Sequence, residues 1–279
     1  YQQLSTRGAE LELLDKQQTN QRIGSSKFFG ALFNKSAGTI NPLSYCIGLA
    51  LAAQSKGANI YETTLATKIQ SINGHWLIKT NEGSIEAKKL LIATNAYQQP
   101  IKGIKSPEYT SVHYFQVATN PLPEKDTKMI LPNGEGCWDT ASVMSSFRLD
   151  EDNRLIIGGV GNLGHGASKI HTNWARRKIK SLFPNLKNIP IEYNWHGRIA
   201  MTANHIPKIQ KLGNNAFSVF GFSGRGIGPG TYFGKAIVES LLSGDENSLP
   251  VTPMSQNKER YSGIKSKLFE LGATASHLL

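Results

Sequence analysis

The sequence predicts a mixed α/β (α+β) fold in which an α/β layer accompanies an antiparallel sheet. Residues 41–97 have the pattern of a helix followed by strands. Beyond Pro107, β-forming segments alternate with turn clusters such as "PNGEG" and "DEDN". At 279 residues, 39% of them hydrophobic, the chain can bury a sizeable core in one large or two small domains.

The α/β layer is predicted from residues 41–97. Asn41 is an expected N-cap with Pro42 in the first helical turn, an apolar stripe follows, and Gly57 ends the helix. Residues 76–80 then alternate as a strand, and "SIEAKKLLIATNA" runs into a buried strand that ends in small residues. This order of elements is typical of a nucleotide-binding α/β layer.

The antiparallel sheet is predicted from "SVHYFQVATNPL", "GCWDTASVMSSFRL" and "NRLIIGGVGN". Next, "ASKIHTNWARRKIKSLFPNL" has apolar residues at helical spacing and predicts an amphipathic helix that Pro184 ends. The strand "IEYNWHGRIAM" follows. A buried strand, "NAFSVFGFSG", then leads through a glycine-rich loop into the helix "TYFGKAIVESLLSG".

The formal charge of +11 raises the question of nucleic-acid binding, but the Lys and Arg residues are scattered. Their two local bunches, residues 175–180 and 258–267, lack interleaved aromatic residues and predict solvated helix faces. No apolar stretch is long enough to cross a membrane, and the first residues do not have the pattern of a signal peptide. We therefore expect neither nucleic acid nor a membrane as a partner.

The cysteines and histidines predict no metal chemistry. Cys46 and Cys137 lie far apart without a CxxC motif, which favours reduced thiols in a cytoplasmic protein. The seven histidines show neither HxH nor HExxH spacing, so we expect no metal site.

The glycine loop is the strongest functional signal. Its glycines stand at positions 221, 224, 226, 228 and 230, after a buried strand and before a helix. Gly224 and Gly226 match the start of G-x-G-x-x-G, but Pro229 occupies the third glycine position, and no Walker GK[ST] follows. Backbone without Cβ atoms and free helix amides suit a phosphate or the N1–C2=O edge of a reduced flavin. A strand–helix crossover needed only for packing is the alternative, and the loop alone does not decide between them.

Five ordered segments together carry a family resemblance. "GFSGRGIGPGTYFGKAIVESLLSG" resembles the C-terminal flavin loop of the FAD-dependent D-amino-acid-oxidase-like (DAO) superfamily, and "WHGRIAMTANHIPKIQ" resembles the segment that precedes it. Three further segments resemble family elements in the same order: "FFGALFNKSAGTINPLSYCIGLALAAQSKGANIYE", "KKLLIATNAY" and "SSFRLDEDNRLIIGG". The resemblance covers roughly residues 10–245 and is nearest to the γ-glutamylputrescine-oxidase-like amine oxidases.

The resemblance implies an incomplete FAD/NAD(P)-binding domain together with an antiparallel-sheet substrate domain. Family members begin with a βαβ unit and G-x-G-x-x-G, which this sequence lacks, so we expect a C-terminal fragment that depends on that missing N-terminal unit or on a partner chain. The implied division is residues 1–38, an initial part of the substrate domain; 39–105, part of the FAD-binding domain; 106–194, the substrate domain; 195–245, the C-terminal part of the FAD-binding domain; and 246–279, a C-terminal tail.

The resemblance also assigns candidate site residues. Those expected to contact the cofactor are Ala93, Thr94, Asn95, Gly224, Arg225, Gly226 and Ile227. Tyr114, Arg148 and His196 are candidates for the substrate pocket, with packing as their alternative role. Ile199 stands where amino-acid oxidases carry a carboxylate-binding arginine. Gly197 stands where sarcosine-oxidase relatives carry the cysteine that attaches flavin, which implies noncovalent FAD.

The implied function is oxidation of a C–N bond of an amine or amino acid to an imine, with FAD as cofactor and a small-molecule amine as substrate. No acid–base pair stands out as catalytic. Two alternatives remain open: a flavin-dependent tRNA side-chain oxidase, and a non-catalytic remnant or interaction module that lacks the ADP-binding unit.

Overall fold

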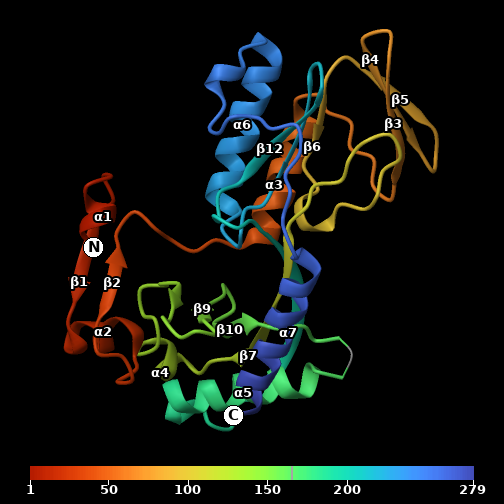
Figure 1. Ribbon diagram of the computed structural model, residues 1–279. Coiled ribbons are helices and arrows are strands. Elements are labelled where there is room, and N and C mark those ends of the chain that lie inside the picture. The colour runs from red at the N-terminus through yellow and green to blue at the C-terminus, as the bar shows by residue number, and fades with distance from the viewer. Residues whose placement is uncertain (165) are drawn as a thin grey trace. The chain divides into compact units, whose positions relative to one another are not determined.

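A computed structural model describes residues 1–164 and 166–279. The chain forms two compact units. Unit 1 comprises residues 1–45, 113–197 and 269–279, and unit 2 comprises residues 46–112 and 198–268. The chain therefore passes repeatedly between the units, so that the boundaries fall within continuous elements instead of in linkers. Figure 1 labels the helices and strands in chain order.

A five-stranded sheet forms the centre of unit 1, in the order β11-β7-β10-β9-β8. Its strands are β7 (Thr110–Pro121), β8 (Cys137–Trp138), β9 (Ser145–Leu149), β10 (Arg154–Val160) and β11 (Ile191–Met201). β10 pairs antiparallel with both β7 and β9, and β9 pairs antiparallel with β8. This is the predicted antiparallel sheet.

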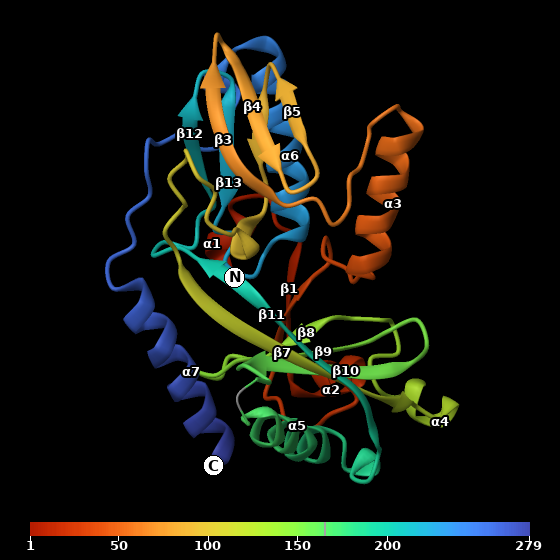
Figure 2. The ribbon, with the colours of Figure 1, turned by 90° about the vertical axis from the view of Figure 1, so that its right-hand side faces the viewer.

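One face of this sheet is buried against α5 (Ser168–Leu182), as Figure 2 shows. The alternation in β7 sends Phe115 and Val117 to this face, where they pack with residues of β9, β10 and α5. Because Phe115 and Val117 occupy this face, the side chains that alternate with them in β7, Tyr114 and Gln116, lie on the opposite face.

The remaining elements of unit 1 are short. They are α1 (Gln2–Ser5), β1 (Leu11–Leu14), α2 (Lys16–Ile23), β2 (Ala31–Asn34), α4 (Glu124–Thr127) and η2 (Pro184–Leu186). β1 and β2 form an antiparallel pair. Asp15 begins α2 with a complete capping box, in which its side chain accepts from Gln18 N–H and the Gln18 side chain accepts from Asp15 N–H.

Unit 2 contains two three-stranded sheets. The first is an antiparallel meander, β3-β4-β5, visible in Figure 2. The second has the order β12-β13-β6, with β13 antiparallel to β12 and parallel to β6. The bounds are β3 (Ala66–Ile72), β4 (His75–Thr80), β5 (Ser84–Ala87), β6 (Leu90–Ile92), η1 (Asn95–Tyr97), β12 (Lys208–Gly213), β13 (Ala216–Phe220), α6 (Ile227–Ser243) and η3 (Glu246–Ser248).

α6 packs against the second sheet through its apolar face. Phe233, Ile237 and Leu241 recur at helical spacing and contact Ile209, Phe217 and Val219 of β12 and β13. All five residues of β13 are buried, as expected for a strand covered on both faces. α6 begins at Ile227, earlier than the sequence predicts, because the fixed φ of Pro229 is compatible with the first turn of a helix.

Two helices carry residues of both units. α3 (Pro42–Ser55) follows the predicted N-cap, and the Asn41 side chain accepts hydrogen bonds from the N–H groups of Leu43 and Ser44. No residue of α3 is buried, although its apolar side chains lie all around the helix. α7 (Ser262–Leu278) occupies much of the segment expected to be a tail, and Ala273 and His277 on it are buried.

No helix in the described part of the chain is both long and apolar enough to cross a membrane.

Candidate functional site

Two segments predicted to contact a cofactor meet at one edge of the second sheet of unit 2. β6 and β13 are parallel neighbours, so their carboxyl ends lie at the same edge. Ala93, Thr94 and Asn95 follow β6, and the glycine loop follows β13. In parallel sheets, ligands bind outside the carboxyl ends of the strands. The topology thus brings together residues that lie more than a hundred positions apart in the sequence.

A hydrogen bond joins the two segments directly. The Gly221 N–H donates to Asn95 Oδ1 over 3.0 Å, and Asn95 itself has a left-handed backbone with φ of 46°. Gly221 has φ of 82°, and a Cβ atom there would lie 2.4 Å from Cγ2 of Thr202. Glycine is therefore required at this position by both backbone conformation and space.

The loop after Gly221 exposes unpaired backbone donors. The N–H groups of Gly224, Gly226, Ile227 and Gly228 have no acceptor within the described residues. They surround the N-terminus of α6, where the helix dipole is positive. Gly224 has φ of 84°, and a Cβ built at Gly228 or Gly230 would meet no described atom within 4 Å outside the adjacent backbone of the helix. The loop thus offers donors and free space to an electron-rich, flat ligand edge.

Arg225 adds a cation to this loop. Its side chain is exposed and forms no ion pair or hydrogen bond with any described residue. Beside the loop, Ile199 Cδ1 lies 3.5 Å from a Cβ built at Gly224, whereas the Arg198 guanidinium lies 4.8 Å from the centroid of the Tyr97 ring. The residue of this strand that approaches the glycine loop is thus apolar.

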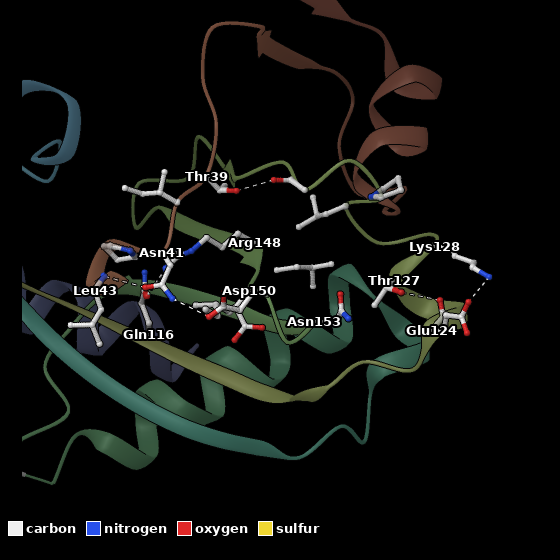
Figure 3. Close-up of a pocket in the computed structure, with 18 of the residues that line it drawn as sticks. Thr39, Asn41, Leu43, Gln116, Glu124, Thr127, Lys128, Arg148, Asp150 and Asn153 are labelled. Atoms are coloured by element: carbon white, nitrogen blue, oxygen red, sulfur yellow. Dashed lines mark hydrogen bonds and ion pairs between the residues drawn. The ribbon is translucent and has the colours of Figure 1, made fainter. Parts of the chain in front are cut away.

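Unit 1 contains a cavity of about 990 Å³ on the sheet face opposite α5. Gln116, Arg148, Ile156 and Trp195 form its floor. The chain at residues 39–43 and 124–134 supplies its walls. Figure 3 shows Arg148 and Asn41 close together at one side, whereas Glu124, Thr127 and Lys128 lie at the other side.

The floor of the cavity is held by hydrogen bonds that cross β10. Arg148 on β9 donates to Gln116 Oε1 on β7 over 3.2 Å, and the hydroxyls of Tyr114 and Ser146 lie 2.8 Å apart. Between them is Gly158, where a Cβ would lie 2.4 Å from the Phe115 carbonyl oxygen. The absence of a side chain at this glycine provides the room that the Tyr114 and Gln116 side chains occupy.

Burial shifts the pKa values of Arg148 and of the adjoining Tyr114. It lowers the pKa of Arg148, and the nearby Tyr114 and Asp150 partly offset this decrease. It raises the pKa of Tyr114, against the opposing effect of the Ser146 hydrogen bond. Tyr114 is therefore a neutral hydrogen-bonding group at neutral pH, while Arg148 keeps its charge.

The three predicted pocket residues thus differ in their positions. Arg148 lines the cavity, Tyr114 lies in the adjoining row of the same sheet face, and His196 is exposed and packs edge-on against His113 at 5.8 Å. Sequence reasoning missed Asn41, Gln116 and Trp195 as lining residues. The alternation of β7 could have identified Gln116, which shares a face with Tyr114.

The sequence profile of the DAO family, described as FAD dependent oxidoreductase, matches residues 1–240. The chain belongs to this family. The predicted family and the mixed α/β fold are therefore confirmed. "Gamma-glutamylputrescine oxidoreductase" of Escherichia coli K12 is 30% identical over 241 residues, which are 85% of this chain and 55% of that relative. "Probable oxidoreductase OrdL" of Haemophilus influenzae has the same identity over the same length, with the same coverage of both chains. The chain thus spans about half the length of these relatives.

Solved structures support the same fold at lower identity. The L-proline dehydrogenase from P. horikoshii has a TM-score of 0.75 at 21% identity, and 88% of this chain covers 68% of that one. The glycine oxidase from Geobacillus kaustophilus has a TM-score of 0.75 at 18% identity, with 93% and 70% covered.

The residues at the carboxyl ends of β6 and β13 fit the family's cofactor. The electron-rich N1–C2=O edge of a flavin needs donors and a close approach to backbone, and the unpaired amides and uncrowded glycines of the loop provide both.

Proposed function

We propose that this chain carries part of an FAD-dependent oxidoreductase that oxidises the C–N bond of an amine or amino acid to an imine. The observation that carries the proposal is the meeting of residues 93–95 and the glycine loop at one end of the sheet, where the unpaired amides belong to exposed residues. The chemistry that bound FAD supplies is acceptance of a hydride from the carbon of that C–N bond.

The chain's own residues hold and polarise the cofactor. The amides of Gly224, Gly226, Ile227 and Gly228 would donate to the flavin's pyrimidine edge, and Arg225 would stabilise negative charge there. Ala93 and Thr94, both exposed at the end of β6, would face the same ligand. The cavity of unit 1 is large enough for a small amine and has both apolar and polar walls.

We also propose that the flavin is held without a covalent bond. β11 contains no cysteine, and the two cysteines of the chain are free thiols. Burial and the nearby Glu135 raise the pKa of Cys137 to about 12, so this thiol is a poor nucleophile at neutral pH. Acid precipitation of flavin-loaded protein should release all of the flavin, and intact-mass measurement should give the mass of the unmodified chain.

The activity is tested by loading the chain with FAD under anaerobic conditions and adding γ-glutamylputrescine, glycine or L-proline. The proposal predicts that at least one of them bleaches the visible flavin absorbance. Gly226→Ala should weaken FAD binding because it adds a methyl group to the exposed loop. Gly83→Ala in the β4–β5 turn is the matched control, since a Cβ at either position meets nothing closer than 3.9 Å.

Two results would contradict parts of the proposal separately. Flavin that binds but is reduced by none of a broad panel of amines would contradict the activity. Equal FAD affinity in Gly226→Ala and in wild type would contradict the assignment of the loop.

A further inference from the structure

The cavity of unit 1 contains a cation without an anionic partner. Arg148 is largely buried, and its one hydrogen bond within the described residues goes to the neutral side chain of Gln116 at 3.2 Å. No carboxylate of the described residues lies within ion-pairing distance of it. A guanidinium has five N–H donors, so most of its capacity remains unused. A partly buried charge in this state is stabilised when an anion binds beside it.

The carboxylates that line the same cavity are already engaged. Asp150 accepts from the N–H groups of Asp152 and Arg154 at 3.0 and 2.7 Å and lies 3.9 Å from the Arg154 guanidinium. Glu124 pairs with Lys128 at 2.7 Å, and Glu151 accepts from the Asn41 side chain at 3.3 Å. None of these acids neutralises Arg148, although Asp150 is close enough to raise its pKa.

The surroundings of Arg148 select the kind of anion. Ile156 pairs with Arg148 across the β9–β10 ladder and lines the floor, and Leu131 and Trp195 add apolar surface to the cavity. Figure 3 shows the Arg148 side chain extending toward Asn41 at one side of the cavity. A planar carboxylate can accept two parallel hydrogen bonds from one guanidinium, while an aliphatic chain would contact the apolar walls.

We propose that Arg148 binds a carboxylate carried on an aliphatic chain, so that the substrate of this protein bears a carboxylate in addition to its amine. The assignment of this carboxylate to a substrate rests on the proposed oxidase function. Carboxylate binding itself does not, because it involves only residues of unit 1. Arg148 would act here as a specificity-determining residue.

The test compares pentanoate with its neutral isostere pentanamide, using calorimetry or ligand-observed NMR on the whole chain without added flavin. Pentanoate should bind wild type about tenfold more tightly than pentanamide, and Arg148→Gln should remove this preference. Arg148→Lys keeps the charge without the planar fork and should retain about a third or less of the wild-type affinity for pentanoate. Arg176→Gln, an exposed residue on α5, is the matched control and should bind like wild type.

Equal binding of the two probes to wild type, or unchanged pentanoate affinity in Arg148→Gln, would overturn the inference, as would the absence of pentanoate binding at millimolar concentration. Circular dichroism verifies that each variant is folded. If Arg148→Gln does not fold, Arg148→Lys decides, and its binding pentanoate as tightly as wild type contradicts the bidentate site. Because the measurement involves neither FAD nor turnover, a failure here is distinguishable from a failure of the oxidase proposal.

Discussion

The cavity of unit 1 and the glycine loop of unit 2 present polar groups to a ligand in different ways. In the cavity, Gln116 and Arg148 extend from strands on either side of β10, and the strand register fixes their positions. In the loop, the donors are backbone amides, and the glycines leave space around them. We therefore expect the two sites to respond differently to mutation. Ligand binding in the cavity should be weakened by the loss of side chains, and ligand binding at the loop should be weakened by the addition of side chains.

The largest expected effect concerns the glycine beneath the cavity. Gly158→Ala would place a methyl group 2.4 Å from the Phe115 carbonyl oxygen and 2.8 Å from Gln116 Cγ, inside a packed sheet. We expect the free energy of unfolding to fall by about 2–4 kcal/mol. Urea denaturation followed by tryptophan fluorescence measures this. A loss below about 0.5 kcal/mol, the size expected of a neutral surface substitution, would show that the sheet around Gly158 is not tightly packed.

Acid should weaken unit 1 through two buried histidines. His171 on α5 and His277 on α7 lie with their Nδ1 atoms 2.8 Å apart, and neither Nε2 has a partner within the described residues. Burial, the adjacent His171 and Arg177 lower the pKa of His277 to about 4. Burial also lowers the pKa of His171, and Glu270 partly offsets this.

The sign of this effect follows from the direction of the shifts. In the unfolded chain a histidine takes up a proton near pH 6.5, whereas His277 in the folded chain stays neutral at that pH and the pKa of His171 is also lowered. Stability is therefore fully present above pH 6.5 and is lost as the pH falls toward about 4. We expect a loss of about 1–3 kcal/mol over this range, measured by urea denaturation at each pH. His277→Gln should flatten this pH dependence, because it removes the ring whose pKa is lowered to about 4. An unchanged slope would contradict the assignment.

In the loop, an added methyl group should affect the ligand instead of the fold. Gly228 lies in the first turn of α6 and has no atom within 4 Å of a built Cβ. Alanine is the better helix former, so Gly228→Ala should leave stability unchanged or raise it by up to about 1 kcal/mol. FAD affinity should nevertheless fall about tenfold, because the methyl group would occupy the space next to the free amides. Thermal melting and flavin titration of the same sample separate the effect on stability from the effect on FAD affinity. An unchanged FAD affinity would contradict the prediction that an added side chain at this loop weakens ligand binding.

The smallest effect is expected at the wall of the cavity. Lys128 and Glu124 form an exposed ion pair at 2.7 Å, four residues apart. Lys128→Ala should change the free energy of unfolding by no more than about 0.5 kcal/mol. Pentanoate affinity should change less than about threefold, because the exposed ammonium is solvated. A tenfold loss in calorimetry would move the carboxylate site from Arg148 to this side of the cavity.

The loop could be predicted from the sequence, whereas the cavity could not. The glycine spacing after a buried strand is local, and β13 and α6 follow from apolar patterns in the same stretch. The partners of Arg148 depend on the register of β7, β9 and β10, which joins residues more than thirty positions apart. Alternation predicts which face a side chain occupies but not which neighbour it meets across the sheet.

α3 shows another limit of pattern reasoning. Its sequence predicts a helix correctly, from the Asn41 cap to the turn at Gly57. The apolar content of residues 42–55 suggested a stripe facing a core, yet none of these residues is buried. Hydrophobicity indicates that a surface favours burial, but it does not say what covers that surface.

The most direct test of the flavin site is a titration of the purified 279-residue chain with FAD, followed by flavin fluorescence and by the visible spectrum. We expect saturable binding with a shifted spectrum, because the amides around Gly226 and the end of β6 would contact the flavin itself. Binding that does not saturate, or a spectrum identical to that of free FAD, would contradict the claim that this loop is a flavin site.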